Sequence, residues 1–345
     1  MTRTAGHRPR LLVLRALGLG DLLTAVPALR ALRRSHPAHE LLLAAPGRLA
    51  EASAATGAVD RLLPTSAPGR AVPTRIDWTG PPPDMAVDLH GNGPPSHLLL
   101  NALRPGRTLA YAHPATPQIP GPQWREDEHE GARWCRLLTW FGIPADPEDR
   151  RIAAPDDRGS PAPGAVVVHP GADAAARRWP AERFAAVGRA LAAIGHEVIV
   201  TAGAGEAPLA QEVALRAGLP RTVVLGGEAD VPFAELAALL AHARAVVVGD
   251  TGLAHLATAL GTPSVVLFGP VAPRLWGPPR CELHQALWYG SDDTPRPGNA
   301  HGDVPDERLL SISVSDVLTA FDQLPRPGGP PVHRPHPPEF TGAHG

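Results

Sequence analysis

Short, almost wholly apolar runs alternate with longer helical patterns along this chain, and that alternation restricts its fold more than any other feature. In the second half the runs are rich in valine and fall at residues 165–169, 197–201, 222–225, 245–248 and 264–268. Strands that are apolar on both faces are typical of parallel sheets covered by helices on both sides. The alternation of such strands with helices predicts an α/β fold with mainly parallel sheets.

The first half carries the same alternation. It predicts a glycine-rich turn at 18–20, strands at 11–17, 40–45, 85–89 and 108–112, and helices at 21–34 and 127–141. Between the halves, residues 145–164 are dense in Pro, Asp, Arg and Gly, which is typical of a linker. We therefore expect two Rossmann-like domains, residues 1–150 and 151–324, that face each other across a cleft.

Two further segments complete this organisation. The helix after Trp179 has Pro180 suited to its first turn, and its apolar residues recur at three- and four-residue steps, at Phe184, Val187, Leu191 and Ile194. This spacing predicts one buried face. Residues 325–345 are rich in Pro, Gly and His, so we expect a disordered tail there.

The composition limits the function classes. The chain has 345 residues, 43% of them hydrophobic, which is enough for a sizeable core. With 32 basic and 34 acidic residues, no general field recruits nucleic acid. The apolar stretch Leu11–Leu23 is interrupted by Arg15 and Asp21, so we interpret it as a strand and helix of the mature protein, and no run is long enough for a transmembrane helix. Cys135 and Cys281 lie far apart, which favours a reducing compartment, the cytoplasm.

The chain contains no lysine, so all 32 of its basic residues are arginines. A guanidinium is a fixed cation with a planar fork, which holds phosphate well but gives up a proton poorly. Any task that a lysine ammonium usually performs must be performed here by arginine. The 16 histidines form neither an H-x-x-x-H pair nor a cluster with Asp, so no metal site is expected.

The segment Asp250-Thr251-Gly252-Leu253-Ala254-His255 follows directly on the predicted strand at 245–248. It brings backbone N–H groups, a hydroxyl and the positive end of a helix to the carboxyl edge of the sheet, where α/β proteins bind phosphates. An equal alternative is that Asp250 or Thr251 only caps the helix. His255, one turn further on, either reaches the same anion or is merely packed.

Two more loops follow strands of the same half. His169-Pro170-Gly171-Ala172 leads to Arg177 and Arg178, a guanidinium pair suited to a pyrophosphate. The alternative is a solvated pair beside a loop. Glu206, after the strand that ends near Thr201, is placed to accept hydrogen bonds from ribose hydroxyls, unless it only complements the dipole of the next helix.

The turn Arg15-Ala16-Leu17-Gly18-Leu19-Gly20-Asp21 follows the first predicted strand. Gly18 and Gly20 allow a tight turn, and Asp21 lies at the helix start, facing the expected cleft. Asp21 is either a general base or an N-cap carboxylate. Leu23 stands where a dinucleotide fingerprint needs its third glycine, so that motif is absent.

Taken in order, these motifs resemble glycosyltransferase family 9, the heptosyltransferase family. The resemblance runs from about Leu11 to Pro279. It consists of R-x-x-x-x-G-D at 15–21, D-x-x-G-N at 88–92, H-P-G-A and R-R-W-P within 169–180, D-T-G-x-x-H-L-A-x-A-L-G-T-P at 250–263, F-G-P at 268–270 and W-G-P-P at 276–279. It implies the GT-B fold, two facing Rossmann-like domains with mainly parallel sheets.

The resemblance also implies site residues. In the N-terminal, acceptor-side domain, Asp21 matches the proposed catalytic base, and the motif residues on that side are Arg15, Gly18, Gly20, Asp88 and Asn92. In the C-terminal domain, the donor-binding residues implied are His169, Gly171, Arg178, Glu206, Asp250, Thr251, Gly252, Leu253 and His255. Arg177 falls where many members have a lysine that steadies the diphosphate, and a guanidinium there preserves the charge.

The implied reaction is inverting transfer of a sugar, heptose or similar, from a nucleoside-diphosphate sugar such as ADP-heptose to an acceptor hydroxyl. No cofactor is expected, and no metal, because no D-x-D motif is present. The expected acceptor is a glycan, a lipid-linked molecule or a small molecule. Arg30, Arg33 and Arg34 are placed to approach an anionic lipid surface, but cations at a helix C-terminus are ordinary, and we favour that interpretation.

Two other functions fit the same pattern. One is a nucleotide-sugar epimerase or hydrolase in which Asp21 activates water. The other is a non-catalytic nucleotide-sugar binding protein that has kept the cleft. Release of free sugar without an acceptor would favour the first, and binding without turnover the second.

Overall fold

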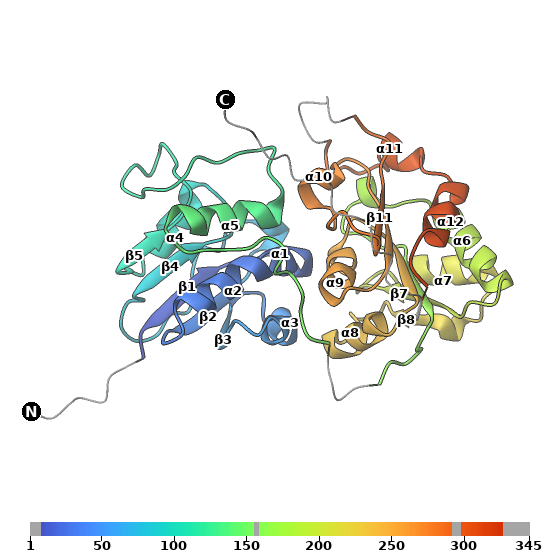
Figure 1. Cartoon of the computed structure of the whole chain (residues 1–345), viewed down its shortest axis with the longest axis horizontal. Coiled ribbons are helices and arrows are strands. Elements are labelled where there is room, and N and C mark those ends of the chain that lie inside the picture. The colour runs from blue at the N-terminus through green and yellow to red at the C-terminus, as the bar shows by residue number, and fades with distance from the viewer. Residues whose placement is uncertain (1–7, 155–158, 292–297, 327–345) are drawn as a thin grey trace, which may run out of the picture.

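The computed structural model describes residues 8–154, 159–291 and 298–326. Within these residues the chain forms two separate β-sheets, each flanked by helices (Figure 1). All neighbouring strands in both sheets run parallel. The α/β fold with two parallel sheets is therefore confirmed. The tail expected to be disordered, 325–345, lies outside the described residues except for its first two.

The N-terminal sheet has five strands in the order β3-β2-β1-β4-β5. Its strands are β1 (Arg10–Leu14), β2 (Glu40–Ala45), β3 (Arg61–Pro64), β4 (Met85–Asp88) and β5 (Arg107–Leu109). Its helices are α1 (Leu19–Thr24), α2 (Val26–Ser35), α3 (Ala50–Ala55), α4 (Pro94–Asn101) and α5 (Glu130–Trp140), with short 3-10 turns η1 (Gly47–Leu49) and η2 (Pro68–Arg70). Because β1 is central, its Leu11–Leu14 segment is fully buried.

The C-terminal sheet has six strands in the order β11-β10-β9-β6-β7-β8. Its strands are β6 (Val166–His169), β7 (Val198–Ala202), β8 (Val224–Gly226), β9 (Ala245–Gly249), β10 (Ser264–Leu267) and β11 (His284–Leu287). Its helices are α6 (Ala181–Ala193), α7 (Ala207–Ala217), α8 (Phe233–Ala241), α9 (Gly252–Leu260), α10 (Pro273–Trp276), α11 (Glu307–Leu310) and α12 (Val314–Asp322), with 3-10 turns η3 (Ala175–Arg177) and η4 (Arg221–Val223).

The structure corrects several predicted boundaries. The first strand ends at Leu14, and Arg15 instead turns into the protein interior. The single helix expected at 21–34 is two helices, because the chain breaks at Ala25 and Pro27, which has no N–H, stands in the first turn of α2. Pro180 is the N-cap of α6 and lies just before its first turn. Ile194 follows the end of α6 and is 68% exposed, so it is not part of the buried face.

The two domains contact each other through helices that begin at the carboxyl ends of their strands. α1 of the N-terminal domain packs against α9 of the C-terminal domain, and α3 packs against α8 (Figure 1). Leu23 and Val26 enter the same apolar cluster as Leu253 and Leu256 of α9. Hydrogen bonds also cross the interface: the Ala234 N–H donates to Glu51 Oε2 at 3.1 Å, His129 Nε2 lies 3.1 Å from the Gly277 carbonyl oxygen, and Arg274 Nη1 donates to the Asp127 carbonyl at 3.5 Å.

No helix among the described residues has both the length and the apolar content needed to span a bilayer.

Candidate active site

A cavity of about 750 Å³ lies between the two domains, where the loops after β1, β6, β7 and β9 meet. It brings together most of the residues that the motifs predict. Those on its wall are Gly18, Gly20, Asp21, His169, Arg177, Glu206, Asp250, Thr251, Gly252, Leu253 and His255. The other predicted site residues, which are Arg15, Asp88, Asn92, Gly171 and Arg178, are not on that wall.

Asp21 presents a carboxylate to this cavity from the first turn of α1, although its residue is only 4% exposed. It is not the N-cap, which is Gly18; instead Asp21 Oδ2 accepts the Gly18 N–H at 3.1 Å. Burial raises the pKa of Asp21, but the nearby guanidiniums of Arg15 and Arg70 and the hydrogen bonds from Arg70 and Gly18 outweigh it. The net effect lowers the pKa, so Asp21 is ionised at neutral pH.

Arg70 is a site residue that the sequence analysis missed. It lies in η2, a turn between β3 and β4, and its Nη2 donates to Asp21 Oδ1 at 2.9 Å. Its side chain is 43% exposed and lines the cavity. Its local sequence, Pro68-Gly69-Arg70, indicates a turn but nothing about which side chain the turn approaches.

Arg15 lies beneath the cavity, and at 1% exposure it is one of the largest buried side chains. Its Nε donates to the Asp21 backbone carbonyl at 2.9 Å, and its Nη2 donates to Glu130 Oε1 at 2.9 Å. The guanidinium also lies 4.9 Å from the centre of the Trp134 ring and donates to the Leu89 carbonyl. Because these partners occupy its donors, Arg15 holds α1 in place, and we assign it no contact with an acceptor.

The start of α9 forms the opposite wall. Thr251 is the N-cap residue of α9, and its Oγ1 is buried without a hydrogen-bond partner among the described residues. No side-chain cap hydrogen bond forms at this end of α9. No side chain therefore competes for the N–H groups at this end of α9, which is the arrangement that suits an anion.

Asp250 lies directly before this helix and is 9% exposed. Burial raises its pKa to about 6, with a smaller raising effect from Asp21 and a lowering effect from Arg177. The Arg177 Nη1 donates to the Asp250 backbone carbonyl at 2.9 Å, and its Nη2 lies 3.7 Å from Asp173 Oδ2. Arg177 thus reaches the N-terminal end of α9. Arg178 does not line the cavity, and its Nε donates to the carbonyl of Ala172, a lining residue, at 2.9 Å.

Glu206 and His169 meet at the ends of β7 and β6. Glu206 stands at the N-cap position of α7, but its Oε2 accepts the Gly203 N–H at 2.9 Å and makes no cap hydrogen bond. A Cβ on Gly171 would lie 1.9 Å from that same oxygen, so Gly171 makes room for the carboxylate without itself lining the cavity. His169 Nδ1 lies 3.0 Å from Thr201 Oγ1, and burial lowers the pKa of His169.

The D-x-x-G-N motif, residues 88–92, lies in the N-terminal domain outside the cavity wall. Asp88 is fully buried, and its Oδ1 accepts the N–H groups of His90 and Gly91 at 2.9 and 3.3 Å. Its Oδ2 lies 3.7 Å from Nε2 of the equally buried His97. Burial raises the pKa of Asp88 to about 6. Asp88 therefore shapes the turn after β4, and neither it nor Asn92 reaches the cavity.

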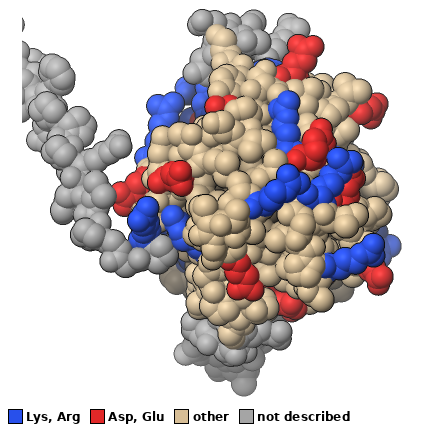
Figure 2. Space-filling model, turned by 90° about the vertical axis from the view of Figure 1, so that its right-hand side faces the viewer, with Lys and Arg blue, Asp and Glu red and all other residues tan. Residues whose placement is uncertain are grey.

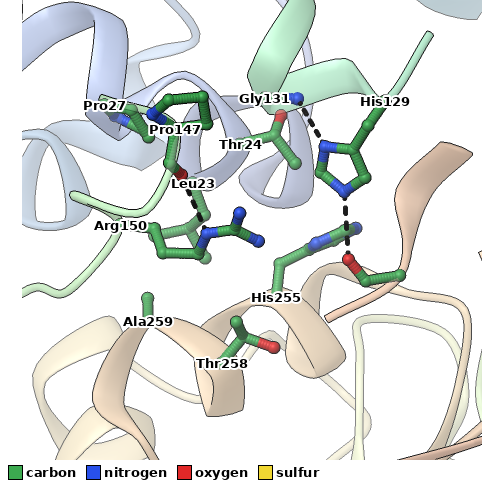
Figure 3. Close-up of a pocket in the computed structure, with 11 residues that line it drawn as sticks. Leu23, Thr24, Pro27, His129, Gly131, Pro147, Arg150, His255, Thr258 and Ala259 are labelled. Atoms are coloured by element: carbon green, nitrogen blue, oxygen red, sulfur yellow. Dashed lines mark hydrogen bonds between the residues drawn. The ribbon is translucent and has the colours of Figure 1, made fainter. Parts of the chain in front are cut away.

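A second, much smaller cavity of about 30 Å³ lies between α2, α5 and α9 (Figure 3). His129 points into it from the N-terminal domain, and His255 from the C-terminal domain. Because Nδ1 of His129 accepts the Gly131 N–H at 3.1 Å, its Nε2 carries the proton that it donates to Gly277. Burial lowers the pKa of His255 to about 4, so this ring is neutral beside Asp21.

Charged groups outside the cleft are largely paired within the chain. Arg30 donates to Asp149 Oδ1 at 2.7 Å, Arg34 donates to the same carboxylate, and Arg33 binds Asp60. These pairs agree with a structural purpose for the basic end of α2. On the face of the C-terminal domain shown in Figure 2, arginines and acidic residues are interspersed, and no single basic patch is seen there. Among the described residues, no group of three or more His, Cys, Asp or Glu side chains is arranged to hold a metal ion.

Part of this chain is similar in sequence to proteins of a known family. Residues 143–293 match the family model of glycosyltransferase family 9 (heptosyltransferase). A segment of 161 residues is 35% identical to lipopolysaccharide heptosyltransferase 3 of Escherichia coli, and it spans 46% of this chain and 46% of that relative. The sequence likeness thus covers just under half of either protein.

Solved structures extend the likeness to the whole fold. The ADP-heptose lipopolysaccharide heptosyltransferase II of Escherichia coli superposes with a TM-score of 0.70 at 18% identity, over 91% of this chain and 97% of that one. A second heptosyltransferase of Escherichia coli, solved with ADP, superposes with a TM-score of 0.62 at 19% identity, over 91% of this chain and 97% of that one. Its structure with ADP-2-deoxy-2-fluoro heptose gives a TM-score of 0.64. The fold is therefore the GT-B fold of these enzymes. Residues 143–293, somewhat less than half of the chain, are thus similar to glycosyltransferase family 9 (heptosyltransferase).

Proposed function

We propose that this protein is an inverting glycosyltransferase that moves a heptose, or a similar sugar, from an ADP-linked donor to an acceptor hydroxyl. One observation carries the proposal. The ionised carboxylate of Asp21 shares a cavity of about 750 Å³ with Arg177, the Thr251 hydroxyl and the uncapped start of α9. A base and an anion site thus face the same space from opposite domains.

The names of the relatives support the choice of sugar and nucleotide. The Escherichia coli relative is a lipopolysaccharide heptosyltransferase, and one solved neighbour was determined with ADP. In the cavity, Thr251, the α9 N–H groups and Arg177 would hold the diphosphate, and Glu206 would accept hydrogen bonds from the ribose hydroxyls. Arginine suits the diphosphate because it keeps its charge.

The proposed step is a single displacement. The acceptor oxygen forms a bond to the anomeric carbon while its proton passes to Asp21. The bond between the anomeric carbon and the diphosphate oxygen breaks on the opposite side, and its electron pair leaves with the nucleoside diphosphate. A positioned base contributes about 10²–10⁴-fold to such a step, and preorganised charge on the leaving group often contributes the largest share.

The surroundings of Asp21 and Arg177 support these assignments. Asp21 needs to be unprotonated before the reaction, and two guanidiniums keep it so. Arg177 is oriented by its hydrogen bond to the Asp250 carbonyl, so its remaining donors are directed without further reorganisation. We also propose a reducing compartment, the cytoplasm, in keeping with the free thiols of Cys135 and Cys281.

A direct assay tests the proposal. The purified protein is incubated with ADP-heptose, and separately with other nucleoside-diphosphate sugars, in the presence of lipopolysaccharide-core, glycan and small-molecule acceptors. Formation of ADP together with a glycosylated acceptor of inverted anomeric configuration is the expected result. Release of free sugar without an acceptor would identify a hydrolase instead, and binding of donor without turnover in any mixture would identify a binding protein.

A further inference from the structure

The carboxylate that we propose as the base is already fully engaged in this structure. Arg70 Nη2 donates to Asp21 Oδ1 at 2.9 Å, and the Gly18 N–H donates to Asp21 Oδ2 at 3.1 Å. Arg15 Nη2 lies 3.6 Å from Oδ1 on the buried side. Asp21 Oδ1 thus already accepts a hydrogen bond from a side chain that itself lines the cavity, so Arg70 competes with an acceptor hydroxyl for this oxygen.

The two guanidiniums beside Asp21 differ in how firmly they are held. Arg15 is 1% exposed and has partners on β4, α1 and α5. The Arg70 side chain is 43% exposed, and Asp21 is its sole hydrogen-bond partner in the described part of the chain. Its backbone has a φ of 62°, a left-handed conformation that is unfavourable outside glycine. Arg70 can therefore leave Asp21 without breaking any other recorded hydrogen bond.

The cavity contains an alternating row of charges that begins at this pair. Asp173 of the C-terminal domain acts electrostatically on Arg70, and its Oδ2 lies 3.7 Å from Arg177 Nη2. Arg177 in turn binds the carbonyl of Asp250. A diphosphate held by Arg177 and Thr251 would add several negative charges at the far end of this row, where they compete with Asp21 for the Arg70 guanidinium.

We propose that Arg70 couples donor binding to release of the base, because its guanidinium leaves Asp21 for the diphosphate of the donor and thereby frees Oδ1 for the acceptor hydroxyl. This inference rests on the proposed function and adds a regulation of the same site. Arg70 acts through Asp21, so it is a positioning residue. Its departure also removes a cation that lowers the pKa of Asp21, which makes Asp21 a stronger base when the donor is present.

Few other charges near Asp21 can change during this exchange. Arg15 faces Asp21 from the end of β1 and is fixed. His90 and His255 are both neutral at pH 7, since burial lowers the pKa of each to about 4. Asp250 faces Asp21 across the cavity, and burial holds its pKa near 6. Among these groups, Arg70 is the cation whose side chain is partly exposed and whose recorded hydrogen bond goes to Asp21 alone.

The affinity for ADP, measured by calorimetry at pH 7.5 and fixed ionic strength, tests the coupling without any need for turnover. The proteins compared are the wild type, Asp21→Asn, Arg70→Gln and the double variant. We expect Asp21→Asn to bind ADP about fivefold more tightly, because Arg70 is no longer held, and Arg70→Gln to bind about fivefold more weakly. In the Arg70→Gln background, Asp21→Asn should change the affinity by less than about twofold.

A matched control comes from the same loop. Arg75 is 81% exposed and pairs with Asp77, so Arg75→Gln removes an equal charge without touching the cavity, and it should leave the ADP affinity unchanged. If Asp21→Asn does not fold, Asp21→Ser takes its place in the cycle, since its hydroxyl can still accept the Gly18 N–H.

The outcomes separate this inference from the function on which it rests. Equal tightening by Asp21→Asn with and without Arg70 would mean that the charge of Asp21 repels ADP at long range, and it would overturn the coupling while the proposed function stands. A wild-type protein that binds no nucleoside diphosphate would overturn the proposed function and the coupling together. Tightening that depends on Arg70 supports both.

Discussion

Asp21 serves two purposes with one carboxylate, since it closes the turn at Gly18 and is the proposed base. Asparagine at this position can still accept the Gly18 N–H but has no basic oxygen, so Asp21→Asn should lower the transfer rate by about 10²–10⁴. ADP binding should be about fivefold tighter, as the coupling through Arg70 predicts. The two guanidiniums beside Asp21 lose a charged acceptor, so unfolding free energy should fall by about 1–3 kcal/mol. Transfer rates and urea unfolding measure both effects.

Asp77→Asn is the control for this substitution. Asp77 is 70% exposed and pairs with Arg75 far from the cavity wall, so its amide variant should match the wild type in both assays. Full transfer activity in a folded Asp21→Asn protein would remove Asp21 from the mechanism and leave the acceptor proton without a base.

Asp250 predicts a dependence of stability on pH. Burial raises its pKa from 3.8 to about 6 in the folded protein. Between these values the folded state binds more protons than the unfolded state, so this group lowers the free energy of unfolding as the pH rises from about 4 to about 6. Asparagine at position 250 does not titrate, so Asp250→Asn removes this decrease in the free energy of unfolding. The variant should therefore gain on the order of 3 kcal/mol relative to the wild type between pH 4 and pH 7.

Urea unfolding of both proteins at several pH values checks this expectation. The comparison must be made between the two proteins, because Asp88 has a pKa raised in the same direction and contributes equally to both curves. Parallel stability curves for the wild type and Asp250→Asn would show that Asp250 is not protonated preferentially in the folded state.

At the scale of elements, the contact between α1 and α9 depends on the absence of two side chains. A Cβ on Gly20 would lie 2.7 Å from Cδ2 of His255, and a Cβ on Gly252 would lie 3.3 Å from the Gly20 nitrogen. Gly20→Ala should therefore push the two helices apart and misplace Asp21 against the donor site. We expect transfer to fall by roughly 10²-fold, while far-ultraviolet circular dichroism stays unchanged.

Gly159→Ala is the matched control, because nothing lies within 4 Å of a Cβ built at that glycine. It should leave the transfer rate at the wild-type value. Wild-type turnover in Gly20→Ala would mean that the helices have room to adjust and that their close approach has no importance for the reaction.

The strands differ in how well the sequence predicts them. β2 has the predicted bounds, and β6, β7 and β9 lie within a residue or two of theirs, since buried parallel strands are marked by their own apolar residues. Two edge strands, β3 and β11, were not predicted, whereas the partly buried edge strands β5 and β8 were, so partial burial weakens the apolar pattern of a strand without always removing it. The motifs after the strands of the C-terminal sheet led to the cavity because carboxyl ends of parallel strands share one edge.

Two arginines show which parts of the site the sequence could not predict. Arg15 belongs to a motif, yet only the fold reveals that its guanidinium is buried under α1 and bound to groups distant in sequence. Arg70 belongs to no motif, and its position beside Asp21 depends on the path of the long connection between β3 and β4. Local sequence patterns carry no information on the path of a long connection. Contacts between residues distant in sequence, such as the one between Arg70 and Asp21, are therefore seen only in the folded structure.

At the scale of the whole molecule, the two domains are held together by contacts that a donor would have to pass. Glu51 of α3 accepts the Ala234 N–H at the start of α8, and both elements line the cavity. Phe233 packs against the apolar clusters of both domains. These contacts hold the two walls of the cavity in a fixed relation, which is what the proposed transfer between groups on opposite domains would need.

The groups proposed to bind the donor all belong to the C-terminal domain, so this domain should bind ADP without the N-terminal one. Arg177, Glu206 and Thr251 all lie in the C-terminal half, and the large apolar cluster under α6, α7 and α12 is built from that half alone. A fragment of residues 151–326 includes Ile152, which packs with α9 and bonds to the Ala259 carbonyl. It should fold and bind ADP with a micromolar to millimolar Kd, roughly −4 to −8 kcal/mol.

Calorimetry with this fragment, and with residues 8–150 as the matched control, tests the assignment. The control fragment contains Asp21 and Arg70 but none of the donor-side groups, so it should not bind ADP. The C-terminal fragment should bind more weakly than the whole protein, because it lacks the Arg70 guanidinium and leaves Leu253 and Ala254 of α9 without their cover from Leu23 and Val26. A C-terminal fragment that is folded by circular dichroism but ignores every nucleoside diphosphate would place the donor site elsewhere.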